Sequence, residues 1–481
     1  MIMMIKKIYT LTFLVFLFSI LKGHCKSDIE LGFALTLSAP VEYTPGFMGK
    51  AYIMETDSSS TREPSFKAAL TMESSDKDDG RYLCSLQIFL GDVRVWSSGH
   101  YTKMYASNKC IIELAKDGDL RIKRSNKHVG WRSGTSGQGV EKLEIQSTGN
   151  LVLIDAMNLI KWQSFNFPTD VMLSGQRLDV ATQLTSFPKD SNLFYSFEVL
   201  RDKIALFLNL NKLKYSYWEY RPRDNNNTVN FVRLGPKGLD LFDDNSQRIG
   251  RIEQTLIRFL AVGNKTGNLG LYSYKPEKGK FEATFQAVSN TCDLPVACKP
   301  YGICTFSKSC SCIRVASDGD CNSKNSEEEE GVLMKRLCDH EMVELEGVAT
   351  VLRNGTQVRN VSKEGCEELC KKDCECRAAS YSVSDEGFCV MYGVVMGVKE
   401  IERVSGLSYM VKIPKGVRLS GEKSNVRKWV VGLVGGIDAF VVLLLLSGFG
   451  FYFIRKRRKS SSQPHTQTQP QPQPQPQPIA D

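Results

Sequence analysis

A long apolar segment towards the carboxyl end constrains this chain more than any other feature of its sequence. It runs from Trp429 to Ile454 with Asp438 as its one ionisable residue, and it exceeds the ~20 residues that a helix needs to cross a bilayer. The basic run Arg455–Lys459 follows directly, and such runs stay on the cytoplasmic side. We therefore predict a transmembrane helix at 429–454 and a cytoplasmic Gln/Pro-rich tail at 455–481, with the residues before the helix outside the cell.

The amino-terminal residues have the composition of a secretory signal. Lys6 and Lys7 precede the apolar run Ile8–Leu21, which is the charged and then apolar order of a signal peptide. The run is shorter than a membrane span, so a retained anchor is the weaker alternative. We predict a signal peptide at 1–25, and hence a single-pass type I protein of the plasma membrane with an extracellular ectodomain.

The positive net charge does not indicate nucleic-acid binding. The chain carries a formal charge of +9, and the run Arg455–Lys459 contributes to it strongly. No basic stripe interleaved with aromatic residues remains elsewhere in the sequence, and such a stripe is the usual footprint of a nucleic-acid interface. The predicted ectodomain instead carries N-glycosylation sequons, which fit an extracellular location, at Asn226, Asn264, Asn354 and Asn360.

The cysteines predict two small disulfide-stapled modules. The chain has 15 cysteines, and an extracellular compartment favours disulfides over metal ligation for them. Most crowd into two groups separated by the acidic linker Glu327–Glu330, and segments this small need bridges for stability, so we expect each group to be bridged within itself. The first cysteine group is Cys292, Cys298, Cys304, Cys310, Cys312 and Cys321, and the second is Cys338, Cys366, Cys370, Cys374, Cys376 and Cys389. Upstream, Cys84 and Cys110 are expected to pair with each other.

The region from Leu31 to Asn290 reads as short β-strands separated by Gly, Asn and Asp. Two segments in it, 111–122 and 143–154, repeat one pattern of two alternating strands around a two-residue turn, Gly118-Asp119 or Gly149-Asn150. A repeated hairpin predicts a prism or barrel with internal symmetry.

A helix is expected in the second cysteine group. Between Lys363 and Lys371 the spacing of Cys366, Leu369 and Cys370 places the three side chains on one helix face. Two bridges from this face are expected to hold the helix against a strand at 378–383.

The chain resembles a known family at several of these places. Gly149–Asp155 followed by Trp162–Asp170 resembles the closing signature of the bulb-type (monocot mannose-binding) lectin domain of plant S-domain proteins. Phe194–Glu198 and Lys214–Glu219 are similar to the S-locus-glycoprotein-like β region of that family. The first cysteine group resembles its EGF-like module, and the second its PAN/apple module.

This resemblance implies a mainly β chain with the domain order of a plant S-domain (G-type lectin) receptor-like protein, without the kinase that the family usually carries after the membrane. The expected parts are a bulb-type lectin-like β-prism at 28–175, a second β region at 176–290, an EGF-like module at 292–321 and an α+β PAN/apple domain at 338–415.

The resemblance also identifies candidate sugar-binding residues. Mannose sites of such lectins carry Gln, Asp, Asn, Val and Tyr at alternate positions of one strand. In the first hairpin the corresponding residues are Ala115, Asp117, Asp119, Arg121 and Lys123, which keep only Asp117. In the second they are Gln146, Thr148, Asn150, Val152 and Ile154, which keep Gln146, Asn150 and Val152. We therefore expect degenerate carbohydrate-binding positions at Asp117, Gln146, Asn150 and Val152.

The rest of the sequence favours recognition over catalysis. No acid, base and nucleophile are arranged as in an enzyme, and Cys310-Ser311-Cys312 is better explained as disulfide cysteines than as metal ligands. We expect no enzyme activity, no cofactor and no bound metal. The expected role is a cell-surface recognition or co-receptor protein for an extracellular glycan or protein; an active mannose-type lectin and a structural cell-wall-contacting glycoprotein are the alternatives.

The predicted span carries features suited to a partner in the membrane. Asp438 is costly in a bilayer unless it is paired or protonated. Gly432 and Gly436 form a Gly-x-x-x-Gly face that permits close approach of another helix. A receptor kinase is the expected partner, and simple snorkelling of Asp438 is the alternative.

Overall fold

The structure is a computed structural model. It describes residues 26–56, 63–75, 80–125, 128–186, 192–222, 228–313, 340–383, 387–402 and 406–414, together with residues 448, 450 and 452. Within these residues no helix is both long and apolar enough to span a bilayer. The predicted signal peptide lies outside the described residues, as do Asp438, Gly432 and Gly436. The chain divides into two compact units, Met1–Val417 and Arg418–Asp481.

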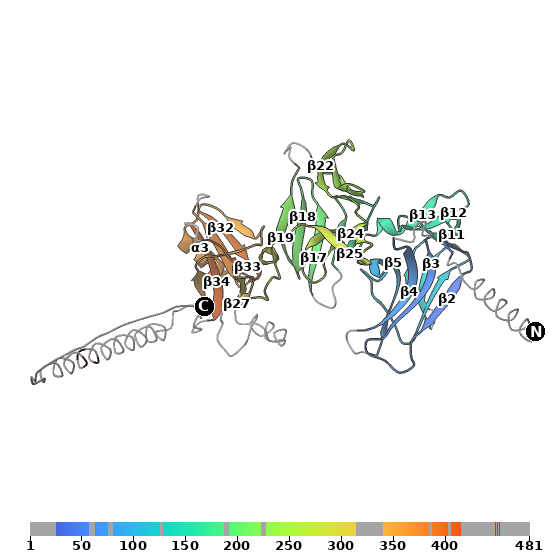
Figure 1. Cartoon of the computed structure of the whole chain (residues 1–481), viewed down its shortest axis with the longest axis horizontal. Coiled ribbons are helices and arrows are strands. Elements are labelled where there is room, and N and C mark those ends of the chain that lie inside the picture. The colour runs from blue at the N-terminus through green and yellow to red at the C-terminus, as the bar shows by residue number, and fades with distance from the viewer. Residues whose placement is uncertain are drawn as a thin grey trace, which may run out of the picture. The chain divides into compact units, whose positions relative to one another are not determined.

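The amino-terminal part forms three antiparallel sheets around one core (Figure 1). Each sheet combines one early strand with three consecutive later strands. The first contains β1 (Asp28–Glu30), β11 (Val140–Ile145), β12 (Leu151–Asp155) and β13 (Ile160–Gln163). The second contains β2 (Ala34–Ser38), β8 (Lys109–Leu114), β9 (Leu120–Arg124) and β10 (Val129–Arg132). The third contains β3 (Met48–Glu55), β4 (Phe66–Ser74), β5 (Tyr82–Leu90) and β6 (Val93–Ser97), with β7 (Met104–Ala106) paired to β5.

Alternation of apolar residues forms this first prism. On β8 and β9, Ile112, Leu114, Leu120 and Ile122 are fully buried in the core, whereas the intervening Glu113 points away from it. Burial of these aliphatic side chains stabilises the fold by roughly 1.5–3 kcal/mol each. The same alternation leaves one face of each hairpin outside the core.

The internal repeat is threefold. Three tryptophans at the ends of β6, β10 and β13 pack edge to face, with ring centroids separated by 6.4 Å (Trp96 and Trp131), 5.9 Å (Trp96 and Trp162) and 5.9 Å (Trp131 and Trp162). A serine follows each tryptophan by two residues, and its hydroxyl accepts a hydrogen bond from the N–H of a core leucine: Leu86 to Ser98 (3.0 Å), Leu120 to Ser133 (3.0 Å) and Leu151 to Ser164 (2.9 Å). The predicted symmetry is therefore present, with β4–β6 as a third copy.

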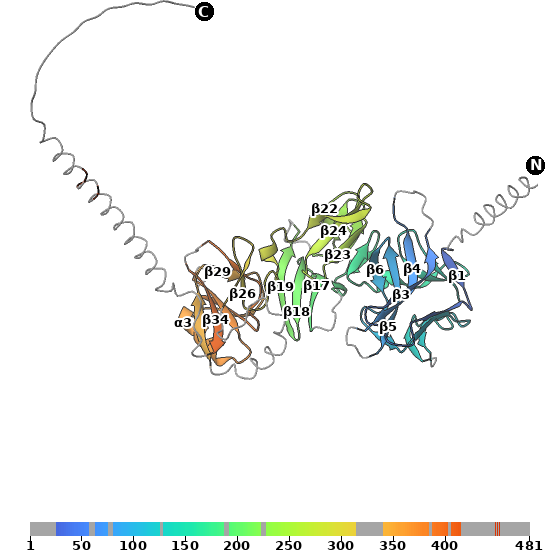
Figure 2. The same cartoon turned by 60° about the horizontal axis from the view of Figure 1, so that its bottom comes forward.

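The next part of the chain repeats the same strand connectivity (green to yellow in Figure 2). Three early strands, β14 (Val171–Leu173), β15 (Arg177–Asp179) and β16 (Gln183–Thr185), each join three consecutive later ones. Strand β16 joins β17 (Leu193–Val199), β18 (Ile204–Leu210) and β19 (Leu213–Tyr220); β15 joins β20 (Phe231–Gly235), β21 (Gly238–Phe242) and β22 (Arg248–Glu253); and β14 joins β23 (Phe259–Val262), β24 (Leu269–Lys275) and β25 (Lys280–Gln286). The region predicted as a second β region is thus a second prism.

In the carboxyl-terminal part, the described residues form two sheets and the helix α3 (Lys363–Lys372). The larger sheet has the order β28 (His340–Leu345), β34 (Leu407–Pro414), β31 (Ala378–Ser382), β32 (Phe388–Tyr392) and β30 (Thr356–Val358). The smaller has the order β27 (Cys310–Cys312), β26 (Gly302–Cys304), β33 (Val398–Glu400) and β29 (Val348–Thr350). Because β26 pairs in parallel with β33, the two cysteine groups contribute to one sheet. Short 3-10 turns occur at Ser164–Asn166 and Thr291–Asp293.

Each described disulfide with two identified partners joins cysteines of the same predicted group. Cys84 bonds to Cys110, and the described pairs within the two groups are Cys292–Cys304, Cys298–Cys310, Cys366–Cys389 and Cys370–Cys376. Cys312 and Cys374 are also disulfide-bonded. Cys321 and Cys338 lie outside the described residues.

The predicted helix is confirmed as α3 (Lys363–Lys372), with Ser362 as its N-cap. Its predicted attachments are partly wrong. The bridges reach Cys389 on β32 and Cys376 just before β31, and not the strand at 378–383 itself. Leu369 is 39% exposed and does not share the buried face, because the two cysteines one turn apart define that stripe.

Candidate carbohydrate-binding faces of the first prism

The predicted sugar-binding positions lie on the outward faces of the β8–β9 and β11–β12 hairpins. The turns are longer than the two residues expected from the sequence. In the first, the N–H of Ala115 donates to the carbonyl of Asp119, and in the second that of Gln146 donates to Asn150. These hydrogen bonds extend the antiparallel pairing by one residue beyond the strand ends. Each reversal then occurs over three residues ending in a glycine with positive φ, Gly118 or Gly149. The two-residue prediction was wrong because it counted only the Gly dipeptide.

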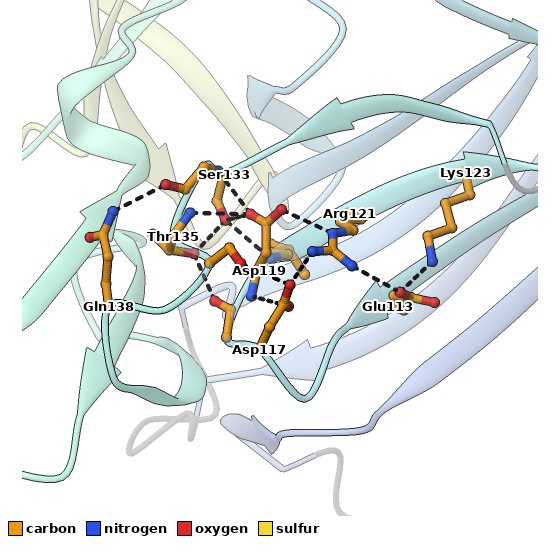
Figure 3. Close-up of polar contacts among 12 residues, drawn as sticks. Glu113, Asp117, Asp119, Arg121, Lys123, Ser133, Thr135 and Gln138 are labelled. Atoms are coloured by element: carbon orange, nitrogen blue, oxygen red, sulfur yellow. Dashed lines mark hydrogen bonds and ion pairs between the residues drawn. The ribbon is translucent and has the colours of Figure 1, made fainter.

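In the first hairpin the Asp119 carboxylate is fully buried and saturated with donors (Figure 3). Its Oδ1 accepts from the Ser133 hydroxyl (2.9 Å) and from the N–H groups of Gly134 (2.8 Å) and Thr135 (3.2 Å). Its Oδ2 accepts from Nε of Arg121 (2.9 Å). Burial alone would raise the pKa of Asp119, but the hydrogen bonds from Arg121, Ser133, Thr135 and Gly134 outweigh it and lower the pKa. Through these hydrogen bonds Asp119 holds the loop that follows β10 in place.

A ladder of ion pairs covers the rest of this face. The Arg121 guanidinium contacts the carboxylates of Asp117 and Asp119 and lies 3.8 Å from that of Glu113. The Lys123 ammonium pairs with the same Glu113. Asp117 also accepts a hydrogen bond from the Ser136 hydroxyl (2.9 Å), which is the largest cause of its lowered pKa. We name these residues the Arg121 ladder: Glu113, Asp117, Asp119, Arg121 and Lys123.

In the second hairpin the Asn150 amide takes the role of the Asp119 carboxylate. Its Oδ1 accepts from the Ser164 hydroxyl and the N–H of Phe165, both at 3.2 Å. Its Nδ2 donates to Oε1 of Gln163 (2.8 Å). The amide is 4% exposed, so its polar atoms are used to hold the chain after β13.

The other retained positions differ in accessibility. Val152 is fully buried and Ile154 is 5% exposed. Gln146 is half-buried, and Thr148 is exposed. Gln146 follows β11 and pairs across the turn with Asn150, which precedes Val152 on β12. Of these three side chains, only that of Gln146 is not buried.

A third face was missed from the sequence. Ser85 precedes Leu86 as Asp119 and Asn150 precede their leucines, so it is the corresponding residue of the third copy. Its hydroxyl lies 2.9 Å from both the Thr71 hydroxyl and Nε2 of Gln87, and all three side chains are almost fully buried. The signal that identifies this copy is the Trp-x-Ser triplet at Trp96, since its turn lacks the Gly-Asp or Gly-Asn dipeptide.

The predicted glycosylation sites among the described residues lie on the surface. Asn264, Asn354 and Asn360 are exposed, and Asn226 lies outside the described residues. Asn354 also donates from Nδ2 to the Ser216 hydroxyl (2.9 Å). Among the described side chains, no group of three or more His, Cys, Asp or Glu is placed to hold a metal ion.

Comparisons with known proteins agree with the lectin signature. The family described as "D-mannose binding lectin" matches residues 94–187. A PAN domain-containing protein of Arabidopsis thaliana is 25% identical over 377 residues, covering 74% of this chain and 71% of the relative. A G-type lectin S-receptor-like serine/threonine-protein kinase of the same plant is 27% identical over 356 residues, covering 61% of this chain and 39% of the kinase.

Among solved structures, a monomeric monocot mannose-binding lectin from Gastrodia elata is 20% identical, with a TM-score of 0.18, over 29% of this chain and 96% of the lectin. The chain spans most of the PAN domain-containing relative but well under half of the receptor-like kinase. It carries a segment that matches the bulb-type lectin family, and over most of its length it is similar to S-domain receptor-like proteins.

Proposed function

We propose that this chain is a non-catalytic cell-surface recognition or co-receptor protein whose ectodomain binds an extracellular carbohydrate or protein ligand and whose mannose-type sites are degenerate. The observation that carries the proposal is the Arg121 ladder. It occupies the face on which a bulb-type lectin would present Gln, Asp, Asn and Tyr side chains to sugar hydroxyls. A sugar would have to displace several charge-assisted hydrogen bonds, each worth about 1.5–3 kcal/mol.

An active mannose-type lectin is the second candidate. It is favoured by the second hairpin, which retains Gln146, Asn150 and Val152 on one face and leaves Gln146 accessible. Against it, the Asn150 amide already has three hydrogen bonds to its own chain, so little of its donor and acceptor capacity remains for a ligand.

The test is binding of a mannose oligosaccharide to the full chain in detergent, measured by calorimetry. We expect no binding tighter than about 1 mM, which corresponds to roughly −4 kcal/mol. A variant that restores the lectin pattern in the first hairpin, Ala115→Gln with Asp119→Asn, Arg121→Val and Lys123→Tyr, should bind measurably because it removes the ladder. Micromolar binding by the unaltered chain, lost on Val152→Arg, which copies the first hairpin into the second, would establish the active lectin instead.

The co-receptor role further requires a partner in the membrane, and the predicted span offers Asp438 and the Gly432/Gly436 face for it. Asp438→Leu, and separately Gly432→Ile with Gly436→Ile, should reduce co-purification of a receptor kinase while surface delivery persists, because each removes one helix contact. A partner set unchanged in both variants would show that the span is only an anchor.

A further inference from the structure

The outward face of the sheet β15-β20-β21-β22 in the second prism is rich in arginine. Leu178, Val232 and Leu234 point into the prism and are buried, so their neighbours on each strand point out. Cross-strand pairing aligns Arg177, Arg233, Asp240 and Arg251 in one row and Asp179, Phe231, Phe242 and Arg248 in the next. We name these eight residues the arginine face.

Aromatic rings hold two of the guanidinium groups in place. Phe231 and Phe242 are stacked with their centroids 4.7 Å apart and an interplanar angle of 11°. The Arg177 guanidinium lies 3.7 Å from the Phe231 centroid, and that of Arg233 lies 5.6 Å and 5.5 Å from the two centroids. Cation–π contact restricts both long side chains before any ligand arrives.

The carboxylates on this face do not neutralise it. Both oxygens of Asp240 accept hydrogen bonds from Arg251, at 2.5 and 3.2 Å, and Asp179 pairs with Arg177. Arg233 is exposed, and among the described residues it forms no ion pair. It stands opposite Arg177 on one side and Asp240 on the other, and Asp240 is hydrogen-bonded to Arg251. Four arginines against Asp179, Asp240 and the neighbouring Glu253 on β22 leave the face with a net positive charge, and Arg233 lies at its centre.

We propose that the arginine face binds a linear polysaccharide of uronic acid residues. Guanidinium groups bind carboxylates in a planar, bidentate manner. Arg177 and Arg233 lie on neighbouring strands, ~4.8 Å apart in the hydrogen-bonding direction, so they can engage carboxylates repeated along one chain. The face offers more charge than apolar area, since Phe231 is 2% exposed and Phe242 is half-buried. This favours a polar polyanion over an acidic peptide that needs apolar anchors. The site is independent of the mannose-type hairpins, which lie in the other prism.

The test is titration of the full chain in detergent with oligogalacturonate, and with the same oligomer fully methyl-esterified, at two salt concentrations. We expect the acid to bind, the ester not to bind, and binding to weaken as salt rises. Arg233→Gln should raise Kd roughly tenfold or more. Arg201→Gln removes an exposed arginine of the same prism outside this face, and it should leave Kd unchanged.

Two further variants keep the test decisive. Arg177→Gln should weaken binding similarly if Arg233→Gln does not fold, and Arg233→Lys should recover only part of the affinity because it keeps the charge without the planar fork. Equal binding of acid and ester, or an unchanged Kd in the Arg233 and Arg177 variants, would overturn the proposal. Equally tight binding of poly-glutamate would assign the face to acidic proteins and also overturn it. Mannose binding should be the same in all variants, so this result is separable from that for the hairpins.

Discussion

Replacing Trp162 by alanine is expected to lower the free energy of unfolding of the first prism by about 3–5 kcal/mol. The side chain is 7% exposed. It packs edge to face against Trp96 and Trp131 and stacks on Phe167 at 5.7 Å. Removing it leaves a cavity where the three sheets meet, and the remaining two indoles lose their shared partner. Hydrogen exchange of the β11–β13 amides measures the effect on this prism separately from the second.

A matched control lies on the same strand. Ile160 is 46% exposed, so Ile160→Ala should change the free energy of opening by no more than about 0.5 kcal/mol. If Trp162→Ala and Ile160→Ala gave the same exchange rates, the tryptophan cluster would be a consequence of the fold and not one of its main supports.

Local sequence patterns predicted the elements that depend on neighbouring residues. The alternation at 111–122 and 143–154 gave the two hairpins and their buried faces, since a two-residue period follows from the strand itself. The cysteines at 366 and 370, one helical turn apart, gave the helix that the structure places at Lys363–Lys372. In both cases the information lies within about a dozen residues.

Contacts between distant residues could not be predicted in the same way. The third copy of the hairpin uses Ser85 where the others use Asp119 or Asn150, so only the Trp-x-Ser triplet relates it to them. The parallel pairing of β26 with β33 joins residues about a hundred positions apart, and no local pattern specifies it. For the same reason the sequence predicted two separate cysteine modules where the structure has a shared sheet.

At the candidate sugar site, too, local sequence predicted the positions of the residues but not their contacts with distant parts of the chain. Its residues were identified from a pattern of alternate positions, and the structure places Asp117 at the turn of the β8–β9 hairpin and Gln146, Asn150 and Val152 on the β11–β12 hairpin. Their availability was not predictable, because it depends on partners from the loops that follow β10 and β13. The side chains of Asp119 and Asn150 both form hydrogen bonds to those loops. Asp119 accepts one from the Ser133 hydroxyl, and Asn150 accepts one from the Ser164 hydroxyl. A motif match therefore gives the position of a side chain, and its remaining hydrogen-bonding capacity must come from the structure.

The second large effect is expected from acidification, through His100. The imidazole is 7% exposed, and its Nε2 lies 2.8 Å from the Thr185 hydroxyl. Burial lowers the pKa of His100 to about 4; Arg94 acts in the same direction, while Asp170 and the contact with Thr185 oppose it. In the unfolded chain a histidine has a pKa of about 6.5. Between these two pKa values the His100 ring is protonated in the unfolded state and neutral in the folded state. The free energy of unfolding therefore falls as the pH drops from 6.5 towards 4.

The expected loss is about 3 kcal/mol between pH 6.5 and pH 4. Urea denaturation at a series of pH values should show it as a steeper pH dependence in the unaltered chain than in His100→Gln, which lacks the titrating group. The comparison of slopes removes the contribution of carboxylates, which titrate in the same range in both proteins. Parallel slopes in the two proteins, or an NMR titration of the His100 ring with a midpoint near 6.5, would contradict the prediction, because either result requires that the folded chain accept the proton as readily as the unfolded one.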